Sequence, residues 1–293
     1  MVVPMIVEAN GTQLWFDVDG AQLRVDGAAL REYPTVVLVL VHGGPGGWDH
    51  SYFKPWFTAL TDVAQVVYLD LRDHGRSGRS DPDRWSFEQC ADDVRAFCDA
   101  VGISRPVVLG HSMGGMVAML YATRHPGHPR GLVLQSTLAR FDLGRLVEGF
   151  RHVAGDRVAD LARRDYAGDP VTDAEWASVF GAFGPHLPDE RALARRIRNP
   201  AVGEPGMARM RAFDAVADLH RVECPTLVSV GERDPVTPVA AAREIHDALP
   251  AHLRRLDVID GAGHFPWLDT PDRYWAVLRD FVEDVARPDG ADI

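Results

Sequence analysis

Ser112 lies within the sequence Gly-His-Ser-Met-Gly-Gly at 110–115, between an apolar run suited to a β-strand (106–109) and a run of helix-forming residues (116–123). The three glycines lack a Cβ atom, so a strand and a helix can pack closely on either side of the serine. Such a turn would also aim the positive end of the helix at the hydroxyl group. A chance Gly-Ser turn is the alternative, but the flanking strand and helix favour a serine nucleophile on a strained turn.

A serine hydroxyl is a weak nucleophile at neutral pH and needs a base, which in turn needs a group to orient it. Asp234 follows an apolar run at 226–230, and His264 follows another at 253–259. The ends of parallel strands lie side by side at one edge of a sheet. We therefore expect Ser112 to be the nucleophile, His264 the general acid and base, and Asp234 the residue that orients the histidine.

Other roles for these residues stay open at this point. Asp234 could merely cap the turn before Pro235, a common role for aspartate. Asp142 also follows a strand, at a greater distance, and is the alternative acid. His264 could be an ordinary loop histidine, and His111 is expected to pack or to hydrogen bond rather than to transfer protons.

A tetrahedral intermediate needs backbone N–H groups to stabilise its oxyanion. We expect one from Met113, the residue after the nucleophile, and one from the loop His-Gly-Gly-Pro-Gly at 42–46, with Gly44 favoured and Gly43 second. A phosphate-binding loop is the alternative. It is disfavoured because neither Gly-Lys-Ser/Thr nor a dinucleotide-binding pattern follows.

The elements that must position these residues alternate between strand and helix. The apolar run 35–41 is typical of a strand covered on both faces, a hairpin is expected over 5–25, and helices are expected over 51–60 and from 86. Alternation of this kind predicts an α/β fold with a mostly parallel sheet flanked by helices. Further on, Thr237-Pro238 predicts a helix start with a threonine cap.

The alternation stops at 137 and resumes after 213. The intervening stretch is helical in pattern and interrupted by prolines, which predicts an insertion. The expected domains are therefore a core of residues 1–136 and 214–293 and an inserted helical domain of residues 137–213.

Composition excludes several functions. The chain has 293 residues with 46% hydrophobic and 25% charged residues, which suits a globular protein. Its net charge of −11 without a basic run argues against nucleic acid or anionic membrane as a partner. His125 and His128 have the spacing of a metal pair but no third ligand, and Cys90, Cys98 and Cys224 show no metal spacing, so neither a metal nor a cofactor is expected.

The location is expected to be cytoplasmic. No apolar run approaches the length of a membrane span, and the N-terminus lacks the pattern of a signal peptide. The three cysteines are expected to be buried thiols in a reducing compartment. The sequence leaves the oligomeric state open.

The motifs around Ser112, Asp234 and His264 together resemble the α/β-hydrolase superfamily. The loop at 42–46 and Asp-Leu-Arg-Asp-His-Gly-Arg-Ser at 70–77 are more specifically similar to its proline iminopeptidase-like branch. The resemblance implies that residues 137–213 form a helical cap, or lid, over the active site. The chain departs from that branch at Met113, where iminopeptidases usually have tryptophan. Their cap glutamates, which bind a free amino terminus, have three unmatched candidates here: Glu148, Glu175 and Glu204.

We therefore expect a cofactor-free serine hydrolase that cleaves a small carboxylic ester, lactone or amide through an acyl-enzyme. A proline iminopeptidase is the first alternative, and a non-hydrolytic ligand receptor or cofactor-free oxygenase of the same fold is the second. Trp48 and Trp267, which flank the oxyanion loop and the histidine, are expected to line the substrate site. Trp176 is the candidate from the insertion, where most aromatic residues are expected to pack the insertion itself.

Overall fold

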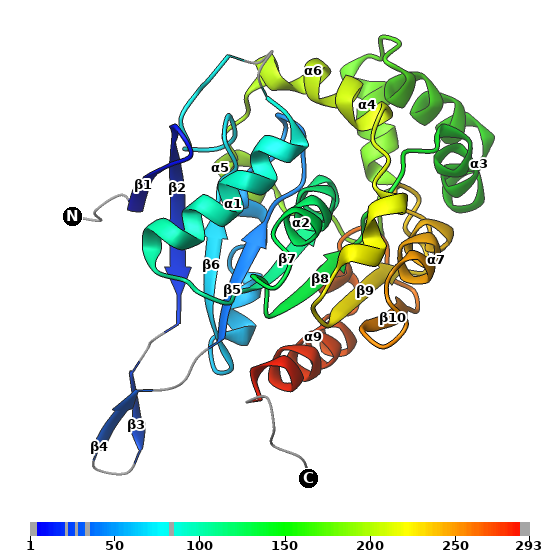
Figure 1. Cartoon of the computed structure of the whole chain (residues 1–293). Helices are drawn as coiled ribbons and strands as arrows, with labels where there is room; N and C mark the ends of the chain where they lie inside the picture. The colour runs from blue at the N-terminus through cyan, green and yellow to red at the C-terminus, as the bar shows by residue number, and fades with distance from the viewer. Residues whose placement is uncertain (1–4, 21–22, 27–28, 33–35, 82–84, 288–293) are drawn as a thin grey trace.

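The computed structural model describes residues 5–20, 23–26, 29–32, 36–81 and 85–287 (Figure 1). Its centre is an eight-stranded sheet in the order β1-β2-β6-β5-β7-β8-β9-β10, in which β5 to β10 run parallel and the edge hairpin β1–β2 is antiparallel. The strands are β1 Met5–Ala9, β2 Thr12–Asp19, β5 Val36–Val41, β6 Ala64–Leu69, β7 Val107–His111, β8 Gly131–Gln135, β9 Thr226–Gly231 and β10 Arg254–Ile259. The α/β fold with a mostly parallel sheet is as predicted.

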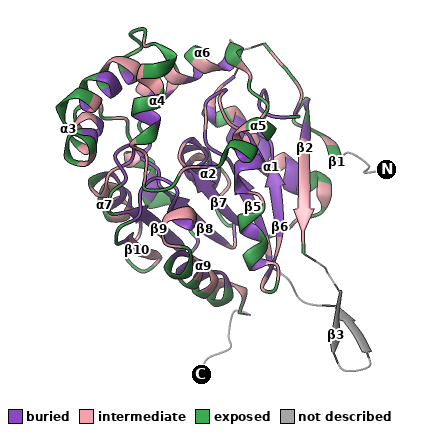
Figure 2. Cartoon of the chain, turned by 180° about the vertical axis from the view of Figure 1, so that it is seen from behind, coloured by how far each residue is buried: buried purple, intermediate pink, exposed green. Residues whose placement is uncertain are grey.

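Helices cover both faces of this sheet because its central strands are apolar on both faces. Side chains of α1, α2 and α7 belong to one core cluster, and those of η1, η2, α8 and α9 belong to the other. Figure 2 shows the buried strands between helices whose outer faces are exposed. These helices are η1 His50–Phe53, η2 Trp56–Leu60, α1 Phe87–Val101, α2 Met113–Arg124, η4 Val216–Arg221, α7 Val239–Ala248, α8 Pro266–Asp269 and α9 Pro271–Ala286.

Three local expectations needed correction. The expected hairpin over 5–25 ends at Asp19, and β3 Leu23–Asp26 pairs instead with β4 Ala29–Glu32 in a separate two-stranded sheet. The expected helix over 51–60 is two short 3₁₀ helices separated at Pro55, which has no N–H to continue the first. Thr237 does not cap α7, because its hydroxyl donates to Asp234 instead.

Between β8 and β9 the chain forms helices: α3 Leu143–Ala167, α4 Asp173–Gly181, α5 Glu190–Arg195 and α6 Pro200–Arg211. Figure 1 shows α3, α4 and α6 together at one end of the sheet. The long α3 bends at Gly155, whose φ of 82° is outside the helical range. No helix within the described ranges is long and apolar enough to cross a membrane.

Candidate active site

Ser112 occupies a strained turn between β7 and α2. Its φ of 55° and ψ of −123° are unusual for a residue with a side chain. A Cβ atom on Gly114 would lie 2.1 Å from the carbonyl oxygen of Val41, and one on Gly110 would lie 2.2 Å from the carbonyl oxygen of Gly114. The close approach of strand and helix therefore requires glycine at both positions, as the sequence predicted.

Asp234 and His264 meet beyond the ends of β9 and β10. Nδ1 of His264 donates a hydrogen bond to Oδ2 of Asp234 over 2.9 Å, and both side chains are buried. A carboxylate only accepts, so Nδ1 carries the proton and Nε2 of the neutral ring is free to accept one. Asp234 is held in turn, because Oδ1 accepts the N–H groups of Val236 and Thr237 and Oδ2 accepts the Thr237 hydroxyl.

The side chains of Ser112 and His264 line the same cavity, which has a volume of about 650 Å³. The Ser112 hydroxyl has no hydrogen-bond partner in the described part of the chain, so it is not committed to another group. The structure thus brings the three expected residues to one edge of the sheet but shows a hydrogen bond only between Asp234 and His264.

The two candidate glycines of the expected oxyanion loop, Gly43 and Gly44, differ in what their N–H groups do. That of Gly43 donates to Oη of Tyr52 over 2.8 Å. Gly44 lies against Met113, since a Cβ at this glycine would be 2.8 Å from the methionine Cε. Within the described ranges the N–H groups of Gly44 and Met113 have no acceptor, so Gly44 rather than Gly43 is available to an oxyanion.

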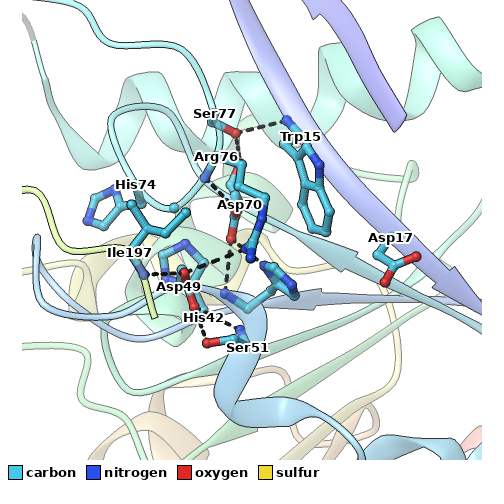
Figure 3. A network of polar contacts seen from close by, with 12 residues as sticks. Trp15, Asp17, His42, Asp49, Ser51, Asp70, His74, Arg76, Ser77 and Ile197 are labelled. Atoms are coloured by element: carbon cyan, nitrogen blue, oxygen red, sulfur yellow. Dashed lines mark hydrogen bonds and ion pairs between the residues drawn. The ribbon is translucent and has the colours of Figure 1, made fainter. Parts of the chain in front are cut away.

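A buried polar network is centred on Asp70, which follows the neighbouring strand β6 (Figure 3). Asp70 accepts the backbone N–H and the Nδ1–H of His50, at 3.0 and 2.8 Å, and the backbone N–H of Arg76 at 2.8 Å. Burial alone would raise the pKa of Asp70, but the hydrogen bond and charge of His50 and the N–H of Arg76 hold this pKa below 3.8. The network therefore requires an ionised carboxylate.

Asp49, His50 and Asp70 are close enough to one another to suggest a metal site, with candidate ligand atoms within 4.8 Å. Each carboxylate oxygen, however, already accepts N–H or O–H donors, and Asp49 Oδ2 accepts the N–H of Ile197 over 2.7 Å. Donors that point at these oxygens occupy the lone pairs a cation would need. The cluster therefore serves as a structural hydrogen-bond network.

The prediction that Trp267 lines the substrate site needs correction. Trp48 and Trp176 line the cavity. Trp267 does not, because its side chain is fully buried behind His111, with ring centroids 4.9 Å apart. Position next to the histidine motif could not reveal this, since α8 turns the indole toward the sheet rather than toward the cavity.

The remaining sequence candidates have structural roles. Asp142 accepts the N–H of Arg145 and caps α3, so it is not placed as the acid. Glu175 forms the capping box of α4 with Thr172. His125 contacts Asp92, and His128 contacts Tyr121. Glu148 is on α3 and pairs with Arg151, outside the cavity lining.

Several charged cavity residues were missed by sequence reasoning. These are Asp165, Arg196 and Arg198, which line the cavity together with Glu204, a residue that the sequence analysis did name. The guanidinium of Arg196 lies over the ring of Trp48, 4.8 Å from its centroid. No motif marks these residues, because they come together only through the packing of the helical insertion on the sheet.

The connection between α5 and α6 is bound to the oxyanion loop. The N–H of Asn199 donates to the carbonyl oxygen of Gly46 over 2.8 Å, and its side-chain amide donates to that of Asp73, also over 2.8 Å. The N–H of Ile197 donates to Oδ2 of Asp49, three residues after this loop, over 2.7 Å. The 196–199 segment and the loop therefore share one set of hydrogen bonds.

A parallel sheet with a serine on a strand-to-helix turn, followed in sequence by an aspartate and a histidine beyond two later strands, defines the α/β hydrolases. The chain belongs to this family: the sequence profile described as alpha/beta hydrolase fold matches residues 36–271. The chain is thereby assigned to a class of hydrolytic enzymes.

Individual relatives span nearly the whole chain. A pimeloyl-[acyl-carrier protein] methyl ester esterase from Neisseria meningitidis is 31% identical over 84% of this chain and 93% of its own. The proline iminopeptidase PfmaB from Pestalotiopsis fici is 26% identical over 94% of this chain and 98% of its own. The crystal structure of VinJ superposes with a TM-score of 0.77 at 23% identity, covering 97% of this chain and 99% of that one, and so shows the shared fold.

Proposed function

We propose that this chain is a serine hydrolase that cleaves a small carboxylic ester, lactone or amide through an acyl-enzyme. Ser112 is the nucleophile, His264 the general acid and base, and Asp234 the orienting acid. The observation that supports this most directly is the 2.9 Å bond from His264 Nδ1 to Asp234. In the neutral imidazole this bond makes Nε2 the nitrogen that can accept a proton, on a ring that lines the same cavity as Ser112.

In the proposed reaction Nε2 of His264 takes the proton of Ser112 as the hydroxyl oxygen attacks the substrate carbonyl carbon. The N–H groups of Met113 and Gly44 stabilise the oxyanion. The imidazolium then returns its proton to the leaving group, and water attacks the acyl-enzyme by the same route. Hydrogen bonds between nucleophile and base are often long in an unliganded site and shorten when substrate binds. No step requires a cofactor.

We infer that residues 137–213 form a cap over a core of residues 1–136 and 214–293. Support comes from the cavity, whose lining combines Ser112 with insertion residues such as Trp176 and Met207. A volume of about 650 Å³ suits a small-molecule substrate. A protein with a net charge of −11 is not suited to bind nucleic acid. The free, buried cysteines favour a cytoplasmic location.

Ser112→Ala tests the proposal. We expect kcat on p-nitrophenyl esters to fall by about 10⁴-fold or more, because substitution of a triad serine removes nearly the whole contribution of the triad. A fluorophosphonate probe should label the wild type at Ser112 and fail to label the variant. Ser178→Ala, an exposed serine on α4, is the matched control. A wild type that neither hydrolyses nor labels would indicate a non-hydrolytic member of the fold, such as a ligand receptor or cofactor-free oxygenase.

A proline iminopeptidase is the second candidate, favoured by the carboxylates in the cavity. Burial and the nearby charge of Glu204 raise the pKa of Asp165, and the positive charge of a substrate ammonium group would counteract both effects by stabilising the ionised carboxylates. PfmaB is named for this activity. Turnover of a prolyl arylamide that disappears when the amine is acetylated would support this candidate, and equal turnover of both forms would exclude it.

A further inference from the structure

His111, the residue before the proposed nucleophile, has a partner at both ring nitrogens. Its Nδ1 lies 2.9 Å from Oη of Tyr52, and its Nε2 lies 2.9 Å from the backbone oxygen of His264. Oη of Tyr52 also accepts the N–H of Gly43 over 2.8 Å. All these groups are buried. A single chain of hydrogen bonds therefore joins the oxyanion loop to the backbone of the proposed base.

The direction of each bond follows from which groups can donate. The carbonyl oxygen of His264 only accepts, so Nε2 of His111 carries a proton. Nδ1 of a neutral ring must then accept, and the Tyr52 hydroxyl donates to it while its oxygen accepts the N–H of Gly43. Burial lowers the pKa of His111 far below its usual value, which keeps the ring neutral. These hydrogen bonds are thus compatible with only the Nε2–H tautomer of His111.

The packing around His111 leaves the ring one orientation. The centroid of Trp267 lies 4.9 Å away and that of Phe265 5.5 Å away. These rings close the apolar side of the imidazole, so rotation would bury an unpaired N–H group, which is unfavourable.

The same chain of hydrogen bonds contacts both the oxyanion loop and the proposed base, His264. At one end it engages the N–H of Gly43, which leaves the next peptide, Gly44, to the oxyanion. At the other end it fixes the peptide of His264 from the core side, while the N–H of His264 donates to Phe183 of the insertion over 2.6 Å. His111 itself is covalently joined to Ser112. Nucleophile, base and oxyanion loop are therefore tied together through this one ring.

We propose that Tyr52 and His111 are positioning residues, which hold the oxyanion loop and His264 in register with Ser112 through the Nε2–H tautomer of His111. The proposal rests on the proposed function and adds two residues to it. Neither residue exchanges a proton with substrate. Their effect is geometric, so it appears in turnover rather than in substrate binding.

Tyr52→Phe tests this chain of hydrogen bonds, because it removes only the hydroxyl oxygen that joins Gly43 to His111. We expect kcat for p-nitrophenyl butyrate to fall by up to about 10²-fold, since small misplacements of reacting groups have effects of this size, while KM stays within a few fold. Tyr274→Phe is the matched control: this buried hydroxyl, in the same aromatic cluster, has no partner in the described part of the chain. Equal activities of the two variants would overturn the proposal.

The coupling between the two residues gives a second readout. His111→Phe should also lower kcat, and the double variant should be little worse than either single variant because both interrupt one chain. His111→Gln, whose amide can still donate to the His264 carbonyl, should recover part of the loss. Additive losses would indicate two independent packing effects. So would losses that follow the unfolded fraction measured by urea titration.

The tautomer can be measured without any substrate. In protein labelled with ¹⁵N in the histidine rings, the His111 signals, identified by their loss in His111→Phe, should show protonated Nε2 and unprotonated Nδ1 at pH 7. A protonated Nδ1, together with fluorophosphonate labelling of Ser112, would overturn the positioning proposal alone. An unlabelled Ser112 in an inactive wild type would overturn the proposed function and this role together.

Discussion

Asp234→Asn tests the orientation of His264 with almost no change in volume. Oδ1 of Asp234 accepts two backbone N–H groups, so the amide oxygen of asparagine must occupy that position. The amide nitrogen then replaces Oδ2 and faces the Thr237 hydroxyl and Nδ1 of His264. An NH₂ group cannot accept the Nδ1 proton, and the reversed amide would point its hydrogens at two N–H groups.

The histidine escapes this conflict by moving its proton to Nε2, where it can no longer accept the proton of Ser112. We expect kcat to fall by about 10⁴-fold, the effect of the same change in other triads. This equals roughly 5–6 kcal/mol at about 1.36 kcal/mol per tenfold. The loss of one hydrogen bond to a charged group should reduce the free energy of unfolding by only about 1.5–3 kcal/mol, so the variant should fold.

The assay is steady-state hydrolysis of a p-nitrophenyl ester, with urea unfolding as the measure of stability. Asp142→Asn is the control, because asparagine caps a helix about as well as aspartate and α3 should be unaffected. Activity of Asp234→Asn within tenfold of the wild type would refute the assigned tautomer. Loss of activity in Asp142→Asn instead would move the acid to α3.

Three further substitutions test the frame of the site. Gly114→Ala should destabilise the fold by about 3 kcal/mol or more, because the new Cβ would meet the backbone oxygen of Val41. Arg72→Met should lower the free energy of unfolding by roughly 3–5 kcal/mol, because it leaves the buried Asp93 carboxylate unpaired. Asp70→Asn should be less stable than the wild type above about pH 4, and this difference should shrink as the pH falls through the lowered pKa of Asp70.

Each of these has a measurement and a control. Urea unfolding at pH 7 should leave Gly181→Ala within about 1 kcal/mol of the wild type, since open space surrounds that glycine. Adding Asp93→Leu to Arg72→Met should recover part of the lost stability, and no recovery would contradict the unpaired charge. For Asp70→Asn, urea midpoints between pH 6 and pH 3 decide, and a constant difference would show that the carboxylate's ionisation is unimportant.

The sequence predicted the parts of the fold that depend on local pattern. Strand β5 could be recognised because a strand buried on both faces must be apolar throughout. The turn at Ser112 could be recognised because its glycines satisfy a steric requirement that no other residue meets. The meeting of Asp234 and His264 could be expected because each follows a strand of the parallel sheet and they come after the serine in that order.

Features that depend on distant contacts could not be predicted. Trp267 lies next to the histidine motif, yet its direction is set by packing against Tyr52 and Phe57 on the far side of the loop. Asp165 and Arg196 belong to no sequence motif, and only the folded structure places both of them in the cavity that Ser112 lines. Thr237 looked like a helix cap because local rules rank caps without reference to a carboxylate such as Asp234.

The hydrogen bonds of Asn199 to Gly46 in the oxyanion loop and of Ile197 to Asp49 just after it have a consequence for how such an enzyme can diversify. Variation between α5 and α6 would reshape the entrance seen by substrates, but it would also disturb the peptide groups proposed to stabilise charge during the reaction. Substrate selectivity and turnover therefore both depend on the segment between α5 and α6. Attempts to graft a foreign insertion onto this core should retain residues 196–199 if turnover is to survive.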